Sequence, residues 1–385
     1  MRTDTNMTES PPAFSREGSS STPFLPSPSK ADAKWPTHHR QRVLFKLLPS
    51  RTQARLSVRH GVQRIAVFFL LFTAVLLGLD RAVNFGMHRI KTSGFGVSNR
   101  IMSGQVNAEI VISGSSRALT HYESDSIERI TGYSTFNIGR NGSQTDMQLA
   151  FLKAYLQNNA KPKLVIHNLD LYSFQTSKEI FDPAQYMPYL DQAPIYKAIR
   201  KIYPDAWKWK YLPLYGYVAE DMRFSWLRGL RALLGFQPRE DHVLGFLPRH
   251  TSWTDDFEKF RASHPDGMQT EMQDKGVRSI EELIELCQRE GIRILLVYSP
   301  EYHEIQTLER NRAEIFSKIR QICAAYSVPF WDYSDSRISE DREYFYNSQH
   351  LNADGATVFS RDLARRLVET AELPARTHPN STVRR

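Results

Sequence analysis

Three short polar blocks follow apolar runs of the sequence, and together they could supply the groups of a serine-based acyl-transfer site. The first block is Gly114-Ser115-Ser116-Arg117, after the apolar run at 109–114. A glycine permits a sharp turn, and a serine at the start of the next helix would expose its hydroxyl and leave its backbone N–H free to stabilise an oxyanion. Taken alone, this block is more typical of an ordinary turn in which a serine caps a helix.

The second block contains Asn137, Gly139 and Gly142 and follows the run at 133–139. Two glycines after a strand allow backbone N–H groups to point into a cleft, which suits a second oxyanion donor and also suits any tight loop. Asn137 and Arg117 are further candidates for contact with a substrate.

The third block places His350 between Asn347 and Asn352, just before the last helical pattern. A general base needs one ring nitrogen within hydrogen-bond reach of the serine hydroxyl. It also needs a partner on the other nitrogen that fixes its tautomer. A lone histidine here is more often a surface residue, but a serine block on the same predicted sheet makes it a candidate base for Ser116.

The order of the three blocks resembles that of the SGNH/GDSL hydrolase superfamily, over about residues 109–370. The resemblance implies that Ser116 is the nucleophile and His350 the base, with Asn347 in the position that orients the imidazole. It also implies that the backbone N–H groups of Ser116 and Gly142 hold the oxyanion. No cofactor and no metal are implied.

Two features depart from the family pattern. The Gly-x-Asn-Asp block expected after the third strand is absent, and neither Asn168 nor Tyr172 restores it, so the third oxyanion donor is unassigned. Asn347 stands where an aspartate is usual, and an amide supplies no negative charge to stabilise an imidazolium. Asp170 and Asp335 are the alternative candidates for the acid of the triad.

From residue 106 onward, short apolar runs alternate with amphipathic helical patterns. Strands are expected at 109–114, 133–139, 163–170, 293–300 and 328–334, and helices at 124–130, 144–159, 279–291, 307–327 and 352–371, the last capped by Asn352. Strands buried on both faces and each followed by a helix predict an α/β fold. The expected form is an open parallel sheet of about five strands flanked by helices, the SGNH or flavodoxin-like three-layer arrangement. A nucleotide-binding flavodoxin-like domain is disfavoured, because Gly-Ser-Ser-Arg is neither a phosphate loop nor a dinucleotide fingerprint.

The alternation breaks down in an aromatic and basic insertion at 175–270. The favoured interpretation is a helical subdomain that packs on the sheet. The alternative is a lid whose tryptophan and tyrosine rings stack on sugar rings or acyl chains.

The N-terminal part of the chain predicts a membrane anchor. Ile65–Leu79 contains no charged residue, and flanking residues could extend it to a transmembrane helix at 61–86. A buried globular helix is the alternative. A cleaved signal peptide is disfavoured, because the preceding residues are too many and no Ala-x-Ala site follows.

The distribution of charge predicts the orientation of the anchor in the membrane, and composition predicts disordered tails. The net charge is +8, and residues 40–64 contain seven Arg or Lys and no Asp or Glu, the pattern of a cytoplasmic N-terminus that leaves the domain at 105–372 outside the cytoplasm. Nucleic-acid binding is disfavoured, since no reading module accompanies the basic block. Disorder is expected in a basic N-terminal tail at 1–60, whose first 39 residues are rich in Ser, Thr and Pro, and in a C-terminal tail at 373–385.

Cys287 and Cys323 each lie on a predicted helix. Two buried thiols are favoured over a disulfide, because nothing in the spacing brings the two residues together. They provide no basis for a metal cluster.

Together with the anchor and the insertion, the two departures make the chain similar to a divergent branch of the superfamily that acylates surface polymers, such as alginate O-acetylation proteins and the D-alanyl transfer protein of teichoic acid synthesis. This resemblance implies an acyltransferase or esterase in the cell membrane, acting on a polysaccharide or wall polymer beside a membrane-bound O-acyltransferase or assembly complex. The rival is a catalytically inactive carbohydrate-binding or assembly component. A distance above about 6 Å from the Ser116 hydroxyl to both ring nitrogens of His350 would favour the rival.

Overall fold

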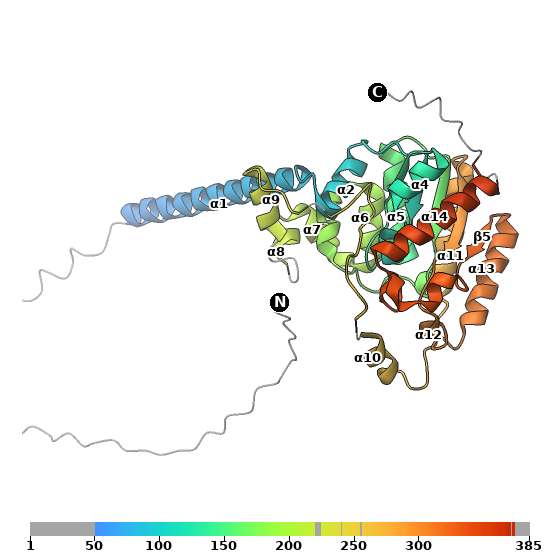
Figure 1. Cartoon of the computed structure of the whole chain (residues 1–385). Coiled ribbons are helices and arrows are strands. Elements are labelled where there is room, and N and C mark those ends of the chain that lie inside the picture. The colour runs from blue at the N-terminus through green and yellow to red at the C-terminus, as the bar shows by residue number, and fades with distance from the viewer. Residues whose placement is uncertain (1–50, 220–224, 240, 255, 371, 374–385) are drawn as a thin grey trace, which may run out of the picture. The chain divides into compact units, whose positions relative to one another are not determined.

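Five parallel strands in the order β2-β1-β3-β4-β5 form the sheet at the centre of the fold (Figure 1). Their bounds are β1 Ile110–Ser113, β2 Thr135–Asn137, β3 Leu164–Asn168, β4 Arg293–Tyr298 and β5 Phe330–Asp332. All five expected strands are therefore confirmed. The chain leaves β1 toward β2 on one side and returns to β3 on the other, so the carboxyl end of β1 lies at the switch point where open α/β sheets bind their ligands.

The computed structural model describes residues 51–219, 225–239, 241–254, 256–370 and 372–373. Its helices are α1 Arg51–His88, α2 Ser93–Met102, α3 Ser116–His121, α4 Ser124–Thr131, α5 Thr145–Asn158, α6 Ala193–Ile202, α7 Trp207–Tyr211, α8 Tyr215–Val218, α9 Ser225–Leu233, α10 Asp256–Ser263, α11 Asp274–Arg289, α12 His303–Gln306, α13 Arg312–Tyr326 and α14 Ala353–Glu369. A short antiparallel pair, β6 Phe345–Asn347 and β7 His350–Leu351, precedes α14. Asn352 caps α14 as expected, since its side-chain oxygen accepts the N–H of Gly355 at 2.9 Å.

Each face of the sheet packs against its own layer of helices. Val111 and Val165 belong to a core shared with α5, α11 and α13, whereas Ile112 and Ile166 belong to a core shared with α4 and α14. This division follows from the alternation of side chains along a strand. The predicted three-layer α/β architecture is confirmed.

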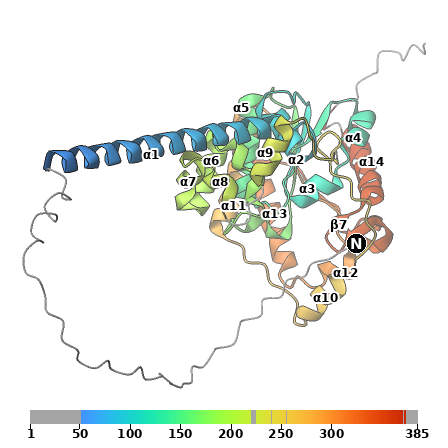
Figure 2. The same cartoon turned by 90° about the vertical axis from the view of Figure 1, so that its left-hand side faces the viewer.

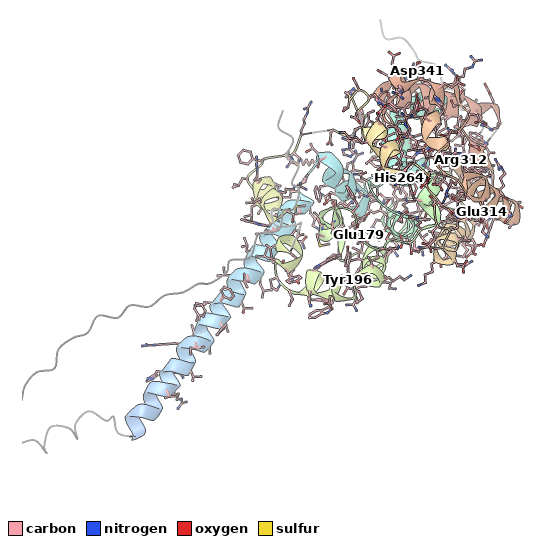
Figure 3. The ribbon with its side chains drawn as sticks, turned by 90° about the horizontal axis from the view of Figure 1, so that it is seen from below. Glu179, Tyr196, His264, Arg312, Glu314 and Asp341 are labelled. Carbon is pink, nitrogen blue, oxygen red and sulfur yellow. The ribbon has the colours of Figure 1, made fainter. Side chains whose placement is uncertain are left out.

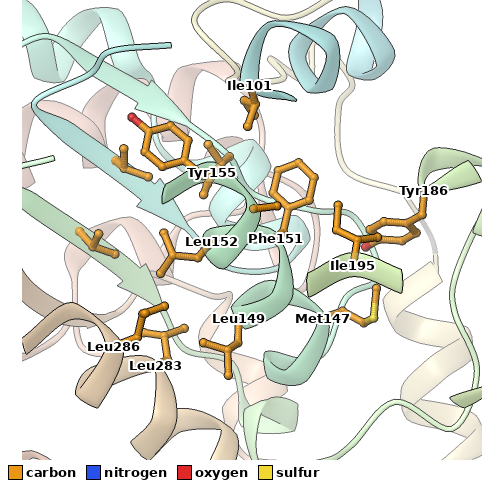
Figure 4. Packing of buried hydrophobic residues seen from close by; sticks show 14 of the residues in the cluster. Ile101, Met147, Leu149, Phe151, Leu152, Tyr155, Tyr186, Ile195, Leu283 and Leu286 are labelled. Atoms are coloured by element: carbon orange, nitrogen blue, oxygen red, sulfur yellow. The ribbon is translucent and has the colours of Figure 1, made fainter. Parts of the chain in front are cut away.

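Helix α5 is the centre of the first core (Figure 4). Leu149 and Leu152 lie on the side toward Leu283 and Leu286 of α11, and all four side chains are buried. Burial of a leucine side chain stabilises a fold by about 1.5–3 kcal/mol. This packing holds the loop before α5, which contains the second polar block, against the sheet.

Helix α1 is longer than the predicted anchor. Its Val58–His88 part is 31 residues long and apolar enough to cross a membrane, and the most apolar stretch within it is not buried in the protein, so it fits a single membrane span or signal anchor. Residues 51–60, which the sequence assigned to a disordered tail, are helical instead, while residues 1–50 lie outside the described part. At the other end, Leu373 is buried rather than in a tail, and 374–385 lie outside the described residues.

The chain divides into two compact units, Met1–Ala66 and Val67–Arg385, and the second contains the sheet. Within this second unit, the described part of the insertion forms short helices, of which α6, α7, α8 and α9 gather beside the end of α1 (Figures 1 and 2). The backbone N–H of Leu214 donates to Asp80 of α1 at 2.8 Å. The hydroxyl of Tyr217 donates to Asn84 of α1 at 3.2 Å.

Candidate active site

The turn after β1 presents Ser116 and uses Ser115 as a helix cap. Gly114 has a φ of +144°, and a Cβ there would lie 2.8 Å from the Cβ of Ala118, so the turn requires glycine. The hydroxyl of Ser115 accepts the backbone N–H of Arg117 at 3.2 Å and caps α3. Ser116 is the first residue of α3 and is half-buried, so its N–H has no partner within the helix.

Ser116, His350 and Asn347 form a hydrogen-bonded chain. The Ser116 Oγ lies 2.8 Å from Nε2 of His350, and Nδ1 of His350 lies 2.9 Å from Oδ1 of Asn347. The β6–β7 hairpin places His350 opposite Asn347, 234 positions along the chain from Ser116. These are the distances that a nucleophile, its base and the group that orients the base require.

The surroundings of Asn347 fix the tautomer of His350. The Oδ1 of Asn347 also accepts the backbone N–H groups of Gln349 at 3.1 Å and of His350 at 3.0 Å. Because these two donors identify this atom as the carbonyl oxygen, Nδ1 of His350 must carry the hydrogen and donate to it. Nε2 is then the unprotonated nitrogen and can accept the proton of Ser116.

The imidazole of His350 is held in its neutral form. Desolvation is the main cause, and the positive charges of Arg117 and Arg249 add to it, so the pKa of His350 is lowered from 6.5 to about 3. Among the described residues, the partner of Nδ1 is an amide rather than a carboxylate, so nothing on that nitrogen offsets the shift. His350 therefore stays unprotonated, and able to accept a proton, in mildly acidic solution, but it is a weak base.

This shift predicts an unusual pH profile. A general base works only when it is unprotonated, so a lowered pKa moves the acid limb of the reaction to lower pH. We expect the rate at which a fluorophosphonate modifies Ser116 to remain nearly constant from pH about 7 to about 5, although an ordinary histidine, with a pKa of about 6.5, would be almost fully protonated at pH 5. Rates measured by intact mass across this range test the point, and a midpoint near pH 6.5 would contradict it.

A second histidine, which the sequence analysis missed, supports the first. Nδ1 of His121 pairs with the Ser299 hydroxyl at 2.8 Å, and Nε2 accepts the backbone N–H of Leu351 at 3.0 Å. Its ring packs edge-to-face against that of His350, with centroids 6.0 Å apart. Desolvation, followed by the charge of Arg117, lowers the pKa of His121 well below its usual value, so it positions the hairpin as a neutral group.

The loop after β2 brings Gly142 to the same place. The backbone N–H of Arg140 donates to the carbonyl of Gly114 at 2.9 Å, which ties this loop to the serine turn. Gly142 has a φ of +61° and lines the pocket that contains Ser116 and His350. Its N–H and that of Ser116 are thus the candidate oxyanion donors.

Gly142→Ala tests this loop. A Cβ at this positive φ would lie 2.4 Å from the Cβ of Phe181, so the loop has to move. Because loss of one oxyanion donor costs about 10²- to 10³-fold in kcat, we expect a fall approaching that size with 4-nitrophenyl acetate. Gly291→Ala is the matched control, since Gly291 has a φ of +71° but has nothing within 4 Å of the added Cβ. Equal rates for the two variants would contradict the assignment of Gly142.

Two asparagines of the sequence analysis lie behind the pocket. Asn137 is fully buried, donates to the carbonyls of Ala118 and Tyr122, and accepts the N–H of Gly139. It therefore positions the loop, and the expectation that it contacts a substrate is wrong. Asn168 is likewise buried, and its amide is committed to the Leu169 carbonyl and the Asp170 carboxylate, so it does not supply the third oxyanion donor.

Arg117 and Asp170 belong to a buried charge cluster. The Arg117 guanidinium lies 3.4 Å from the carboxylate of Glu301 and 3.5 Å from that of Asp170, and its charge centre lies over the Tyr298 ring. Arg312, labelled in Figure 3, binds the other oxygen of Glu301 at 2.5 Å. Two cations thus balance two anions at one side of the pocket. No local sequence pattern marks Glu301 or Arg312 as members of the site.

The cluster predicts a stability effect. Arg117→Met would leave Asp170 and Glu301 without their shared cation in a buried site, and such a loss costs about 3–5 kcal/mol. Urea unfolding measures it. Arg129→Met is the control, because Arg129 pairs with Asp125 on the surface, where both side chains are more than half exposed, and an exposed pair contributes about 0–1 kcal/mol. Similar losses in the two variants would contradict the structural role of the cluster.

Neither alternative acid reaches the histidine. Asp170 is committed to Arg117 and Asn168, and burial, its largest influence, raises its pKa. Asp335 is exposed and is not among the residues that line the pocket. The group on Nδ1 of His350 is Asn347, so the expectation that Asp170 or Asp335 replaces the missing aspartate is wrong.

The pocket is small, and most of the residues that line it have polar side chains. It has a volume of about 150 Å³ and is lined by Ser115, Ser116, Arg117, Gly142, Ser143, Gln144, Asp170, Leu171, Tyr172, Met268, Glu301, Ile305, Gln349 and His350. From the described part of the insertion at 175–270, only Met268 contributes. The tryptophans and tyrosines described there do not line the pocket, so the interpretation of this insertion as an aromatic lid over it is wrong.

Among the described residues, no three or more His, Cys, Asp or Glu side chains lie in an arrangement that could hold a metal ion. Cys287 and Cys323 are buried and unpaired, as favoured above. Burial raises the pKa of these thiols to about 12 and 11, respectively.

Sequence comparison finds no matching protein family and no matching curated protein. The solved structures that match include an acylhydrolase from Bacteroides fragilis, 13% identical, with 68% of this chain and 86% of that chain covered and a TM-score of 0.33. A GDSL-like lipase from Bacteroides thetaiotaomicron is 11% identical, with coverages of 68% and 88% and a TM-score of 0.32. A family two carbohydrate esterase from Clostridium thermocellum, in complex with cellohexaose, is 10% identical, with coverages of 69% and 65% and a TM-score of 0.32.

Proposed function

We propose that this chain is a membrane-anchored, extracytoplasmic serine esterase or acyltransferase of the SGNH type, acting on O-acyl groups of a surface polysaccharide or wall polymer. The observation that carries the proposal is the contact of 2.8 Å between Ser116 Oγ and the unprotonated Nε2 of His350. Ser116, Gly142 and His350 also line one pocket, which supports a catalytic role over the inactive alternative. The distance is also well below the value of about 6 Å that would favour the inactive alternative.

The reaction proceeds in two steps. Ser116 Oγ attacks the carbonyl carbon of an acyl ester while His350 Nε2 takes the hydroxyl proton, and the N–H groups of Ser116 and Gly142 stabilise the oxyanion. His350 returns the proton to the departing alcohol, which leaves an acyl-serine. A second hydroxyl, from a sugar or from water, then gives its proton to His350 and attacks the acyl-serine. His350 returns this proton to Ser116 Oγ as the bond between Oγ and the acyl carbon breaks, which restores the hydroxyl of Ser116.

Three features support the finer parts of the proposal. A pocket of about 150 Å³ suits a short acyl group such as acetyl. The basic block at 40–64 before the apolar helix favours a cytoplasmic N-terminus. The resemblance to polymer-acylating proteins, which rests on the two departures from the family pattern, the anchor and the insertion, favours a carbohydrate acceptor and a membrane-bound O-acyltransferase or polysaccharide assembly complex as partner.

A fluorophosphonate tests the nucleophile. This reagent forms a stable adduct with an activated serine, and the intact mass of the protein shows whether one equivalent has bound. We expect one adduct on the native chain, located by peptide mapping to Ser116, and none on Ser116→Ala. The absence of an adduct on the native chain, or an adduct that persists in the variant, would overturn the proposal.

A further inference from the structure

Most of the large apolar side chains on the surface of the globular part lie in one segment. Outside α1, twelve large hydrophobic side chains are exposed among the described residues, and nine of them lie between 207 and 236. These nine are Trp207, Tyr211, Leu212, Tyr215, Val218, Leu227, Leu233, Leu234 and Phe236. They belong to α7, α8, α9 and the residues that adjoin these helices, here called the anchor-side helices.

The anchor-side helices are fixed to the end of α1. A Cβ on Gly86 of α1 would lie 2.0 Å from the carbonyl oxygen of Gly229 in α9, so the two backbones touch. Asp80 accepts the N–H of Leu214 at 2.8 Å, one residue beyond the charge-free run that ends at Leu79. The exposed apolar segment is thus attached where the apolar part of α1 ends.

The composition of this segment is that of a membrane interface. Tryptophan and tyrosine are enriched at the headgroup level of bilayers, where the ring is apolar and the N–H or O–H remains hydrated. Basic side chains lie among the exposed rings and leucines, with Lys208 and Lys210 on α7 and Arg228 and Arg231 on α9. Long basic side chains place their charge at the headgroups while their stems cover apolar surface.

We propose that the anchor-side helices embed their exposed apolar side chains in the interface of the bilayer that α1 enters, as a second membrane contact of this chain. The structure favours the bilayer over a protein as the partner of this apolar face. Attachment to α1 at Asp80 and Gly86 keeps the face at the level of the membrane surface. A contact on two elements would restrain rotation of the catalytic part about the anchor. The inference rests on the membrane anchor of the proposed function and is independent of the chemistry at Ser116.

Single cysteines labelled with an environment-sensitive fluorophore test this contact in the full chain, reconstituted in phosphatidylcholine vesicles with and without nitroxide-bearing phospholipid. Leu234→Cys reports on the anchor-side helices, where Leu234 is 76% exposed. Phe72→Cys reports on α1, and Val358→Cys on α14 is the control, since Val358 is 42% exposed in another part of the fold. Cys287 and Cys323 are buried, and the unsubstituted chain gives their background.

The three positions separate the outcomes. We expect nitroxide lipid to quench the fluorophore at 72 and at 234 several-fold more than at 358. If position 72 is quenched and 234 behaves like 358, the inference is overturned while the anchor stands, and the face belongs to a protein partner instead. If position 72 is not quenched, the anchor itself is wrong and the inference falls with it.

Discussion

Ser116→Ala abolishes nearly all turnover of 4-nitrophenyl acetate, with an expected fall in kcat/KM of about 10³-fold or more. The variant keeps the backbone N–H groups and the pocket but has no oxygen to form the acyl-enzyme. Steady-state hydrolysis, followed by release of nitrophenolate, measures the loss. His350→Ala should cost nearly as much, because nucleophile and base act as a unit.

Ser115→Ala separates the two neighbouring serines. Ser115 caps α3 through the N–H of Arg117, so its loss should lower the free energy of unfolding by about 1 kcal/mol. Its hydroxyl serves that cap and a hydrogen bond to Asp170, and we expect this variant to retain most of the turnover. A larger loss of kcat/KM in Ser115→Ala than in Ser116→Ala would contradict the assignment of the nucleophile.

Asn347→Leu has the second large expected effect, a fall in kcat of about 10³-fold, because the tautomer of His350 is no longer fixed. The Oδ1 of Asn347 is the acceptor for Nδ1–H and for two backbone N–H groups, and leucine offers none of these contacts. The measurement is kcat for 4-nitrophenyl acetate, with circular dichroism to check that the fold is kept.

Asn347→Asp is the matched partner of that variant. A carboxylate keeps all three acceptor contacts and adds a negative charge, which raises the pKa of His350 from its lowered value and stabilises the imidazolium. The acid limb should therefore move to higher pH, and kcat at neutral pH should rise by about tenfold, the equivalent of one pKa unit. An acid limb that stays in place, or a fall in kcat as large as that of leucine, would show that Asn347 does not act through His350.

The sheet and much of the site could be predicted because their signals are local. Short runs rich in valine and isoleucine identify strands buried on both faces, and all five of the expected strands form. The candidate site residues Ser116, Gly142 and His350 could be identified because each lies shortly after such a run, in a block that contains a glycine, a helix cap or a histidine. The parallel sheet then brings these segments to one edge.

The rest of the site depends on contacts between distant segments. Glu301 is joined to Arg117 across 184 positions, and no local pattern distinguishes it from an ordinary surface glutamate. His121 lies in a polar helix segment, and its role appears only when β7 packs against α3.

The effect of asparagine at position 347 could not be predicted from residue type. An amide can present either its oxygen or its nitrogen to a histidine, and only the oxygen favours the productive tautomer. The choice is made by the backbone N–H groups of Gln349 and His350 in the β6–β7 hairpin. Asparagine in place of the usual aspartate therefore removes a negative charge from the site but leaves His350 in the same tautomer.

The most direct test of the account is the mass of the protein during turnover. When 4-nitrophenyl acetate is mixed with the native chain and quenched in acid, peptide mapping should show one acetyl group on Ser116, and a sugar or water hydroxyl should remove it in the unquenched reaction. Asn347→Leu should form this acetyl-serine much more slowly, and Ser116→Ala should not form it. Turnover without acetylation of Ser116 would contradict the account. So would acetylation of another residue that passes its acetyl group to the acceptor hydroxyl during turnover.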